Sequence, residues 1–82
     1  VKGQGRLDLR HDRASCEEYL GCALFEEGEF SEAAQHFLEA CEQWSALGSR
    51  STEADCRINL ADALLRLGQT EAALREYAAA QK

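Results

Sequence analysis

Residues of this 82-residue chain recur at an offset of 40. A chain that repeats itself folds by stacking its repeated units, so the repeat decides the architecture before any other feature does. The residues that recur are nearly all small or apolar, which indicates a repeated packing pattern and not a repeated active site. The matching pairs include Leu7 and Leu47, Ala14 and Ala54, Cys16 and Cys56, Leu20 and Leu60, Ala23 and Ala63, Leu24 and Leu64, Gly28 and Gly68, Ala33 and Ala73, and Ala40 and Ala80.

Three glycines divide the chain at intervals of 20 residues: Gly28, Gly48 and Gly68. Each follows a stretch in which apolar residues recur at helical spacing. Helices often end at such a glycine because it adopts the left-handed conformation without steric cost. The glycines therefore predict helices at residues 13–27, 32–47, 53–67 and 71–81. Side-chain oxygens that could cap three of these helix starts belong to Ser31, Thr52 and Thr70.

The aliphatic composition favours helices over strands. Fourteen alanines and 11 leucines accompany one valine, one isoleucine, two threonines and no proline, so almost nothing favours a pleated strand. We predict an all-α fold of two antiparallel helix-turn-helix repeats. Residues 12–50 form the first predicted repeat and residues 51–82 the second, while residues 1–11 are expected to be the tail of a preceding repeat or a linker.

The charge of the chain is acidic and unevenly distributed. Nine Lys and Arg against 15 Asp and Glu give a net charge of −6, and residues 14–49 hold eight acidic and no basic side chains. Because phosphates and anionic lipids attract basic surfaces, we expect neither nucleic acid nor a membrane as a partner. No apolar run approaches the length of about 18 residues that a membrane span needs. We expect the chain in the cytoplasm or the nucleus.

The four cysteines are Cys16, Cys22, Cys41 and Cys56. Their spacing contains neither a C-x-x-C pair nor a paired zinc-ligand interval. We expect reduced thiols that act as small apolar side chains, with Cys41 on a buried stripe. A thiol-based metal or redox module stays open as an alternative function.

Catalytic motifs are absent from the sequence. It contains no glycine-rich phosphate loop, no nucleophile elbow and no H-E-x-x-H, and a chain of this length buries only a thin core. The histidines His11 and His36 have no Cys or carboxylate at a local ligand spacing, so both are expected on helix surfaces. We therefore expect no enzyme activity, no metal and no cofactor.

Residues 20–40 form the pattern L-G-x-x-L-x-x-x-G-x-F-x-x-A-x-x-x-F-x-x-A, which resembles the tetratricopeptide repeat signature. The second unit is similar through Leu60, Ala61, Leu64, Gly68, Ala73, Tyr77 and Ala80. The chain departs from the signature in two ways. The early aromatic residue is replaced by Glu17 and Arg57, and the closing proline is replaced by Ser45.

The period of 40 residues is longer than the usual period of about 34. This longer repeat resembles those of the Leu-Gly-Asn adaptor family. The likeness is carried by Leu47, Gly48, Glu53, Ala54, Asn59, Leu60 and Ala61.

The resemblance implies a right-handed α-α superhelix in which the first helix of each pair lines a concave groove. In the family, an Asn where Asn59 stands commonly hydrogen-bonds the ligand backbone. Tyr19 replaces this Asn in the first unit and no Lys/Arg pair accompanies it, so the likeness does not extend to the carboxylate clamp for chaperone tails. The expected groove residues are Glu18, Tyr19, Cys22, Glu26, Asp55, Asn59, Asp62 and Arg66, with Ser15 beside them and Phe25 and Leu65 as apolar floor.

The function that follows from the resemblance is a protein–protein interaction scaffold that binds a peptide or helical segment. Its acidic groove residues favour a basic or amphipathic partner segment. Self-association of exposed helix faces, which would give a homo-oligomer, is an alternative of a different class.

Overall fold

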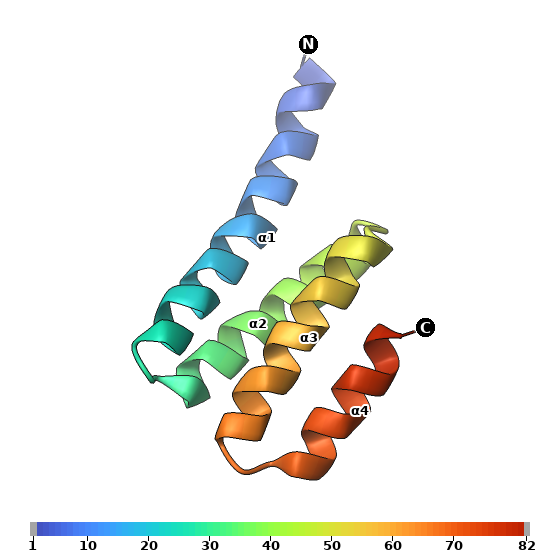
Figure 1. Ribbon diagram of the computed structural model, residues 1–82. Coiled ribbons are helices and arrows are strands. Elements are labelled where there is room, and N and C mark those ends of the chain that lie inside the picture. Colours follow the sequence, from blue (N-terminus) through green and yellow to red (C-terminus); the bar gives the residue numbers. More distant parts are fainter. Residues whose placement is uncertain (1, 82) are drawn as a thin grey trace.

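Four helices make up the regular structure of residues 2–81 in the computed structural model (Figure 1). The structure describes the backbone of residues 2–81 and the side chains of residues 9–81. The helices are α1 (Lys2–Glu26), α2 (Phe30–Ala46), α3 (Arg50–Arg66) and α4 (Thr70–Ala80). Residues 2–81 contain no strand. The predicted all-α fold of two helix-turn-helix units, α1–α2 and α3–α4, is therefore confirmed.

The turns at the three glycines share one geometry. All three glycines have a positive φ, between 74° and 85°, as their helix-ending role predicts. In the first turn, the Gly28 N–H donates to the Phe25 carbonyl at 3.0 Å and the Glu29 N–H donates to the Leu24 carbonyl at 2.9 Å. This pair of hydrogen bonds is the Schellman motif, and it recurs at the other two glycines.

The next helix begins sooner after each glycine than the sequence predicted. The N–H of Glu29 donates to the last turn of α1, as described above. The carbonyl of Glu29 accepts the first hydrogen bond of α2, from the Ala33 N–H at 2.9 Å. One residue thus ends one helix and starts the next. Ser49 and Gln69 occupy the same N-cap position before α3 and α4, and none of the three N-cap side chains makes a capping hydrogen bond. The prediction of caps was wrong for Ser31, Thr52 and Thr70, which lie in the first turns of the helices.

Helix α1 extends N-terminal to its predicted start at residue 13. Residues 9–12 are helical and continuous with the rest of α1, because no proline or glycine interrupts them. The prediction that residues 1–11 end a preceding repeat falls mostly outside the described side chains and stays a prediction.

The core lies along one face of α2. Phe37, Cys41 and Trp44 are buried there. Helix α1 approaches this face closely, since a Cβ atom on Gly21 would lie 2.7 Å from Phe37 Cε1. The other buried members of this core cluster are Ala14, Ala33, Ala34, Ala40, Cys56, Leu60 and Ala63.

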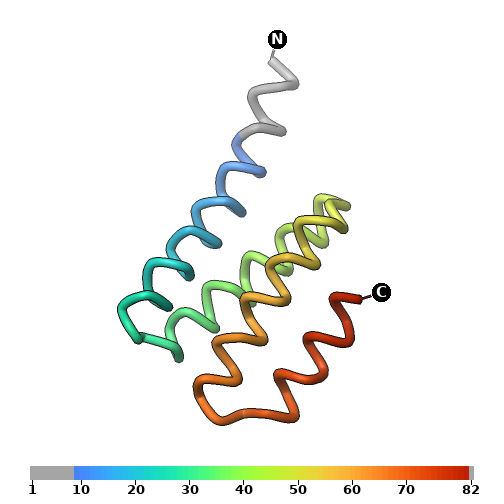
Figure 2. Tube along the Cα trace, in the orientation of Figure 1, coloured from blue at the N-terminus to red at the C-terminus, as the bar shows by residue number. Residues whose placement is uncertain are grey.

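The helices form a flat array with α1 and α4 at its two ends. Consecutive helices pack against one another, and α1 also meets α3. The Cα trace measures 46 × 29 × 12 Å, and Figure 2 shows the chain running up and down through the array. Helix α3 therefore has neighbours on both sides, whereas α4 packs only on α3 within the described chain.

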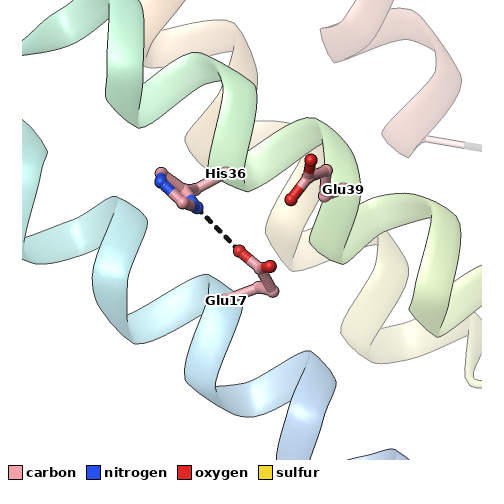
Figure 3. Close-up of side chains that lie close together, drawn as sticks. All are labelled: Glu17, His36 and Glu39. Atoms are coloured by element: carbon pink, nitrogen blue, oxygen red, sulfur yellow. Dashed lines mark hydrogen bonds and ion pairs between the residues drawn. The ribbon is translucent and has the colours of Figure 1, made fainter.

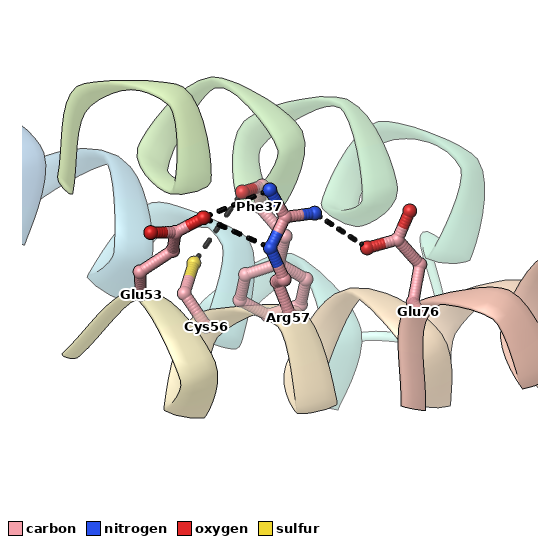
Figure 4. A network of polar contacts seen from close by, with 5 residues as sticks. All are labelled: Phe37, Glu53, Cys56, Arg57 and Glu76. Carbon is pink, nitrogen blue, oxygen red and sulfur yellow. Dashed lines mark hydrogen bonds and ion pairs between the residues drawn. The ribbon is translucent and has the colours of Figure 1, made fainter. Parts of the chain in front are cut away.

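Side chains connect α3 to both of its neighbours (Figure 4). Arg57 donates to Glu53 Oε2 from Nε at 3.0 Å and from Nη2 at 2.8 Å, and to Glu76 Oε1 of α4 from Nη1 at 2.8 Å. The carboxylate of Glu53, with that of Glu76, raises the pKa of Arg57. Toward α2, Cys56 Sγ donates to the Phe37 carbonyl at 3.3 Å. Polar contacts thus fix α3 between α2 and α4.

Candidate functional site

Two adjoining hollows lie between α1 and α3, over buried side chains of α2. The first, of about 130 Å³, has Phe37 in its lining, and the second, of about 200 Å³, has Trp44. Cys22 lines both hollows, so they adjoin at this residue, and we call the two together the α1–α3 groove. Its lining consists of Ser15, Glu18, Tyr19, Cys22, Phe25 and Glu26 from α1, Phe37 and Trp44 from α2, and Thr52, Asn59 and Asp62 from α3.

The structure brings together six of the eight residues that the sequence assigned to a groove. They are Glu18, Tyr19, Cys22, Glu26, Asn59 and Asp62. Asp55 and Leu65 are exposed on α3 and line neither hollow. The guanidinium carbon of Arg66 stands 5.4 Å from the ring centroid of Phe25 and 5.6 Å from that of Phe30. These cation–π contacts hold Arg66 beside the groove and outside its lining.

The sequence did not reveal the aromatic floor of the groove. Trp44 contacts α1. Its Nε1–H donates to Glu18 Oε1 at 3.2 Å, and its ring centroid lies 5.8 Å from that of His11. Phe37 and Trp44 are seven residues apart, close to two helical turns. Their spacing predicts that they share one face of α2, but it does not predict that this face lies below the groove.

Carboxylates dominate the charge of the groove. Among the described side chains that line it, three are carboxylates and none is Lys or Arg. Burial, followed by the nearby charges of Glu18 and Glu26, raises the pKa of Cys22. The Cys22 thiol therefore keeps its proton at neutral pH, and its surroundings favour a cation over an anion.

Two of these carboxylates also have partners within the fold. Glu18 accepts from Trp44, as described above, and Asp62 accepts a hydrogen bond from the Tyr77 hydroxyl of α4. That hydrogen bond raises the pKa of Tyr77. Glu26 is exposed, so it is the lining carboxylate most open to an incoming cation.

Polar groups at two points of the groove could position a bound chain. Asn59 is half-buried in the first hollow, and an amide side chain both donates and accepts hydrogen bonds. Tyr19 is 75% exposed at the second hollow. The groove thus combines an apolar floor with an amide on one wall and a phenol on the other.

A histidine and two carboxylates gather at a separate place on the α1–α2 unit (Figure 3). One ligand atom each from Glu17, His36 and Glu39 lies within 4.8 Å of the others, and His36 Nδ1 is 2.7 Å from Glu17 Oε1. The expectation that no carboxylate stands at a local ligand spacing from His36 was wrong, because Glu39 follows it by one helical turn. Glu17 reaches it from α1. Zn²⁺ accepts such donors, but here the cluster joins α1 to α2. The absence of a metal site stays a prediction.

The four thiols differ in exposure. Cys41 and Cys56 are buried, Cys22 is half-buried and Cys16 is exposed. The burial predicted for Cys41 is confirmed. A hydrogen bond with Cys41, together with burial, raises the pKa of Cys56. A thiolate is the form that attacks electrophiles and binds metals, so Cys56 is held in the unreactive form.

No protein-family model, curated protein or solved structure matches the chain. The resemblance to tetratricopeptide repeats therefore rests on the sequence pattern alone and stays a prediction. Within residues 2–81, no helix combines the length and the apolar character that crossing a bilayer requires.

Proposed function

We propose that this chain is a protein-interaction module, similar to a tetratricopeptide scaffold, that binds a segment of a partner protein in the α1–α3 groove. The observation that carries the proposal is the convergence of side chains from three helices on the two adjoining hollows of the α1–α3 groove. Polar and acidic residues of α1 and α3 form its walls, and buried aromatic rings of α2 lie beneath. Such a combination suits a peptide, which needs an apolar anchor site and polar groups for its backbone.

The aromatic floor supports an apolar anchor in the partner. Phe37 and Trp44 are buried, yet both contribute to the lining of the hollows. A partner side chain that enters a hollow would cover them and lose its own contact with water. Burial of this kind supplies most of the affinity at interfaces between proteins.

The charge of the groove supports a basic or amphipathic partner segment. Two of the three lining carboxylates, Glu18 and Glu26, stand within the acidic part of the chain, since residues 14–49 contain no Lys or Arg. Attraction between such a surface and a basic segment raises the association rate, and salt weakens it. A segment with Lys or Arg beside one or two apolar anchors therefore fits best.

Asn59 supports backbone recognition. Its amide lines the first hollow beside Phe37 and Asp62, where it can donate to a carbonyl and accept from an N–H of an extended or helical segment. The side chain therefore contributes hydrogen bonds that do not depend on the sequence of the partner.

The proposal is tested by selecting ligands from a random peptide library displayed on phage, followed by affinity measurements on the selected peptide. One variant combines Glu26→Lys with Asp55→Lys, both exposed on the groove helices. The matched control combines Glu39→Lys with Glu42→Lys, both exposed on α2 and outside the groove lining. Each pair changes the net charge by +4. Glu18 and Asp62 are left intact because Trp44 and Tyr77 donate to them.

Selected peptides should be rich in Lys and Arg around an apolar residue. The Glu26/Asp55 variant should slow association at low salt several-fold more than the control does, and Asn59→Ala should weaken binding at every salt concentration. Equal effects of the two charge reversals, acidic selected peptides, or failure to select any peptide would contradict the proposal.

A further inference from the structure

The outer face of α1 is exposed although the equivalent face of α3 is buried. We define the outer face of α1 as Cys16, Leu20 and Ala23, whose equivalents 40 residues later are Cys56, Leu60 and Ala63. All three residues of α1 are exposed, and all three of α3 are buried. Leu20 is 47% exposed and Leu60 only 4%. Identical side chains thus differ only in whether a helix covers them.

Helix α2 is the element that covers this face of α3. The contact is marked by the hydrogen bond from Cys56 Sγ to the Phe37 carbonyl at 3.3 Å. Along α2, the residues Ala34, Phe37 and Cys41 are buried. The α2–α3 contact therefore shows which kind of helix face the exposed α1 residues can accept.

Helix α4 presents the equivalent of that α2 face at the opposite end of the molecule. We define the outer face of α4 as Leu74, Tyr77 and Gln81, which follow Ala34, Phe37 and Cys41 by 40 residues. Leu74 is 60% exposed, whereas Ala34 is 9% exposed. Gln81 is also exposed, while Cys41 is buried. No other helix of the described chain packs on α4 besides α3.

We infer that the chain associates end to end, with the outer face of α4 in one copy packed on the outer face of α1 in a second copy. The α2–α3 interface within the chain is the template for this contact. Both halves of the template recur in the described chain, one on α1 and one on α4, so a second copy can supply a covering helix for each of them. By the same equivalence, Cys16 Sγ donates to the Tyr77 carbonyl of the neighbouring copy.

Such a contact joins different surfaces of two copies and leaves one outer face free at each end of the pair. Association of this type continues beyond a dimer unless the geometry closes a ring. Helix α4 has 11 residues against 17 in α2, so the contact is shorter than its template and the association weaker. The outer faces contribute no residue to the α1–α3 groove lining. Peptide binding and self-association can therefore fail separately.

Complementation between two blocked variants tests the inference by sedimentation velocity over a wide range of concentration. Leu20→Glu blocks the α1 outer face and Leu74→Glu blocks the α4 outer face. Both leucines are exposed, so each variant should keep its helical circular dichroism. Leu38→Glu, an equally exposed leucine on α2 that belongs to neither outer face, is the matched control.

The wild-type chain and Leu38→Glu should both gain mean mass with concentration, past that of a dimer. Each blocked variant alone should stay monomeric at every concentration. An equimolar mixture of Leu20→Glu and Leu74→Glu should reach twice the monomer mass and no more, because one intact outer face of each kind remains. A wild-type chain that stays monomeric would show that something other than a second copy covers these faces, and would overturn the inference. Self-association of either blocked variant, or a mixture that stays monomeric, would overturn it as well.

Discussion

Helices α1 and α3 contain the same apolar residues at equivalent positions but bury them to different degrees. In α3, one face packs on α2 and another on α4, while α1 has helices on one side only within residues 2–81. Leu60 and Cys56 are therefore buried, and Leu20 and Cys16 are exposed. The difference teaches that, in this fold, the neighbouring helix determines how much a residue stabilises the chain. The identity of the residue alone does not.

The largest effect expected from this comparison is a contrast between Leu60→Ala and Leu20→Ala. Loss of the buried Leu60 side chain leaves a cavity between α2 and α3 and should lower the free energy of unfolding by about 2–5 kcal/mol. The same change at the exposed Leu20 should cost less than about 1 kcal/mol. Urea unfolding followed by circular dichroism, at a concentration where the chain is monomeric, measures both. Equal losses would show that the two faces are equally covered.

The next effect concerns Gly21, which lies where the second unit has Ala61. An alanine usually stabilises a helix relative to glycine by about 0.5–1 kcal/mol. Gly21→Ala should instead destabilise the chain by about 1–3 kcal/mol, because the added Cβ would lie 2.7 Å from Phe37 Cε1. The sign of the change in the urea midpoint decides the outcome. A stabilised Gly21→Ala variant would mean that α1 and α2 pack less closely than described.

A smaller effect, equal in the two units, is expected at the glycines that end α1 and α3. Gly28 and Gly68 have φ of 85° and 84°, and a Cβ on either would meet nothing within 4 Å. Only the backbone conformation should therefore oppose alanine, at a cost of about 1 kcal/mol for each substitution. Thermal unfolding of the two single variants measures this. Unequal shifts, or none, would show that the two turns do not share the Schellman geometry.

The smallest effect concerns Tyr77, which stands where the first unit has Phe37. Its hydroxyl donates to Asp62, which raises the pKa of Tyr77 in the folded chain. A raised folded-state pKa adds stability below the unfolded pKa of about 10, and this stability is lost as the pH rises through the folded value. Tyr77→Phe should remove the pH dependence that the Tyr77 hydroxyl causes. The wild-type chain should therefore be more stable than the variant at pH 8, and this difference should shrink toward pH 11, a window of about 3 units around the unfolded pKa of tyrosine. A pH-independent difference would contradict the Asp62 contact.

Much of the fold could be predicted from the sequence because its signals are local. The apolar spacing around Phe37 and the regular glycines depend on residues within one helix and its turn. The N-caps were missed because the residue after each glycine ends one helix and begins the next, so Glu29 takes the place expected for Ser31. Nothing within a single helix predicts that overlap.

The residues that form the walls of the candidate site could be predicted from the sequence, but the hydrogen-bond partners of its carboxylates could not. The resemblance to tetratricopeptide repeats implied a groove, and helical spacing placed Cys22 and Asn59 toward it. The partners of its carboxylates come from other helices, since Trp44 is 26 residues from Glu18 and Tyr77 is 15 residues from Asp62. The exposure of Leu20 could not be predicted either, because the same pattern of residues surrounds Leu60, which is buried in the second unit.

The comparison between α1 and α3 is tested most directly by the reaction rates of Cys16 and Cys56 with a thiol reagent, resolved by mass spectrometry. In dilute, monomeric protein, Cys16 should react at nearly the rate of a free thiol, since it is exposed. Cys56 is buried against α2 with a raised pKa, so it should react only when the helices open, many times more slowly. Similar rates for the two thiols in the folded chain would contradict the claim that α2 covers this face of α3 while the equivalent face of α1 is exposed.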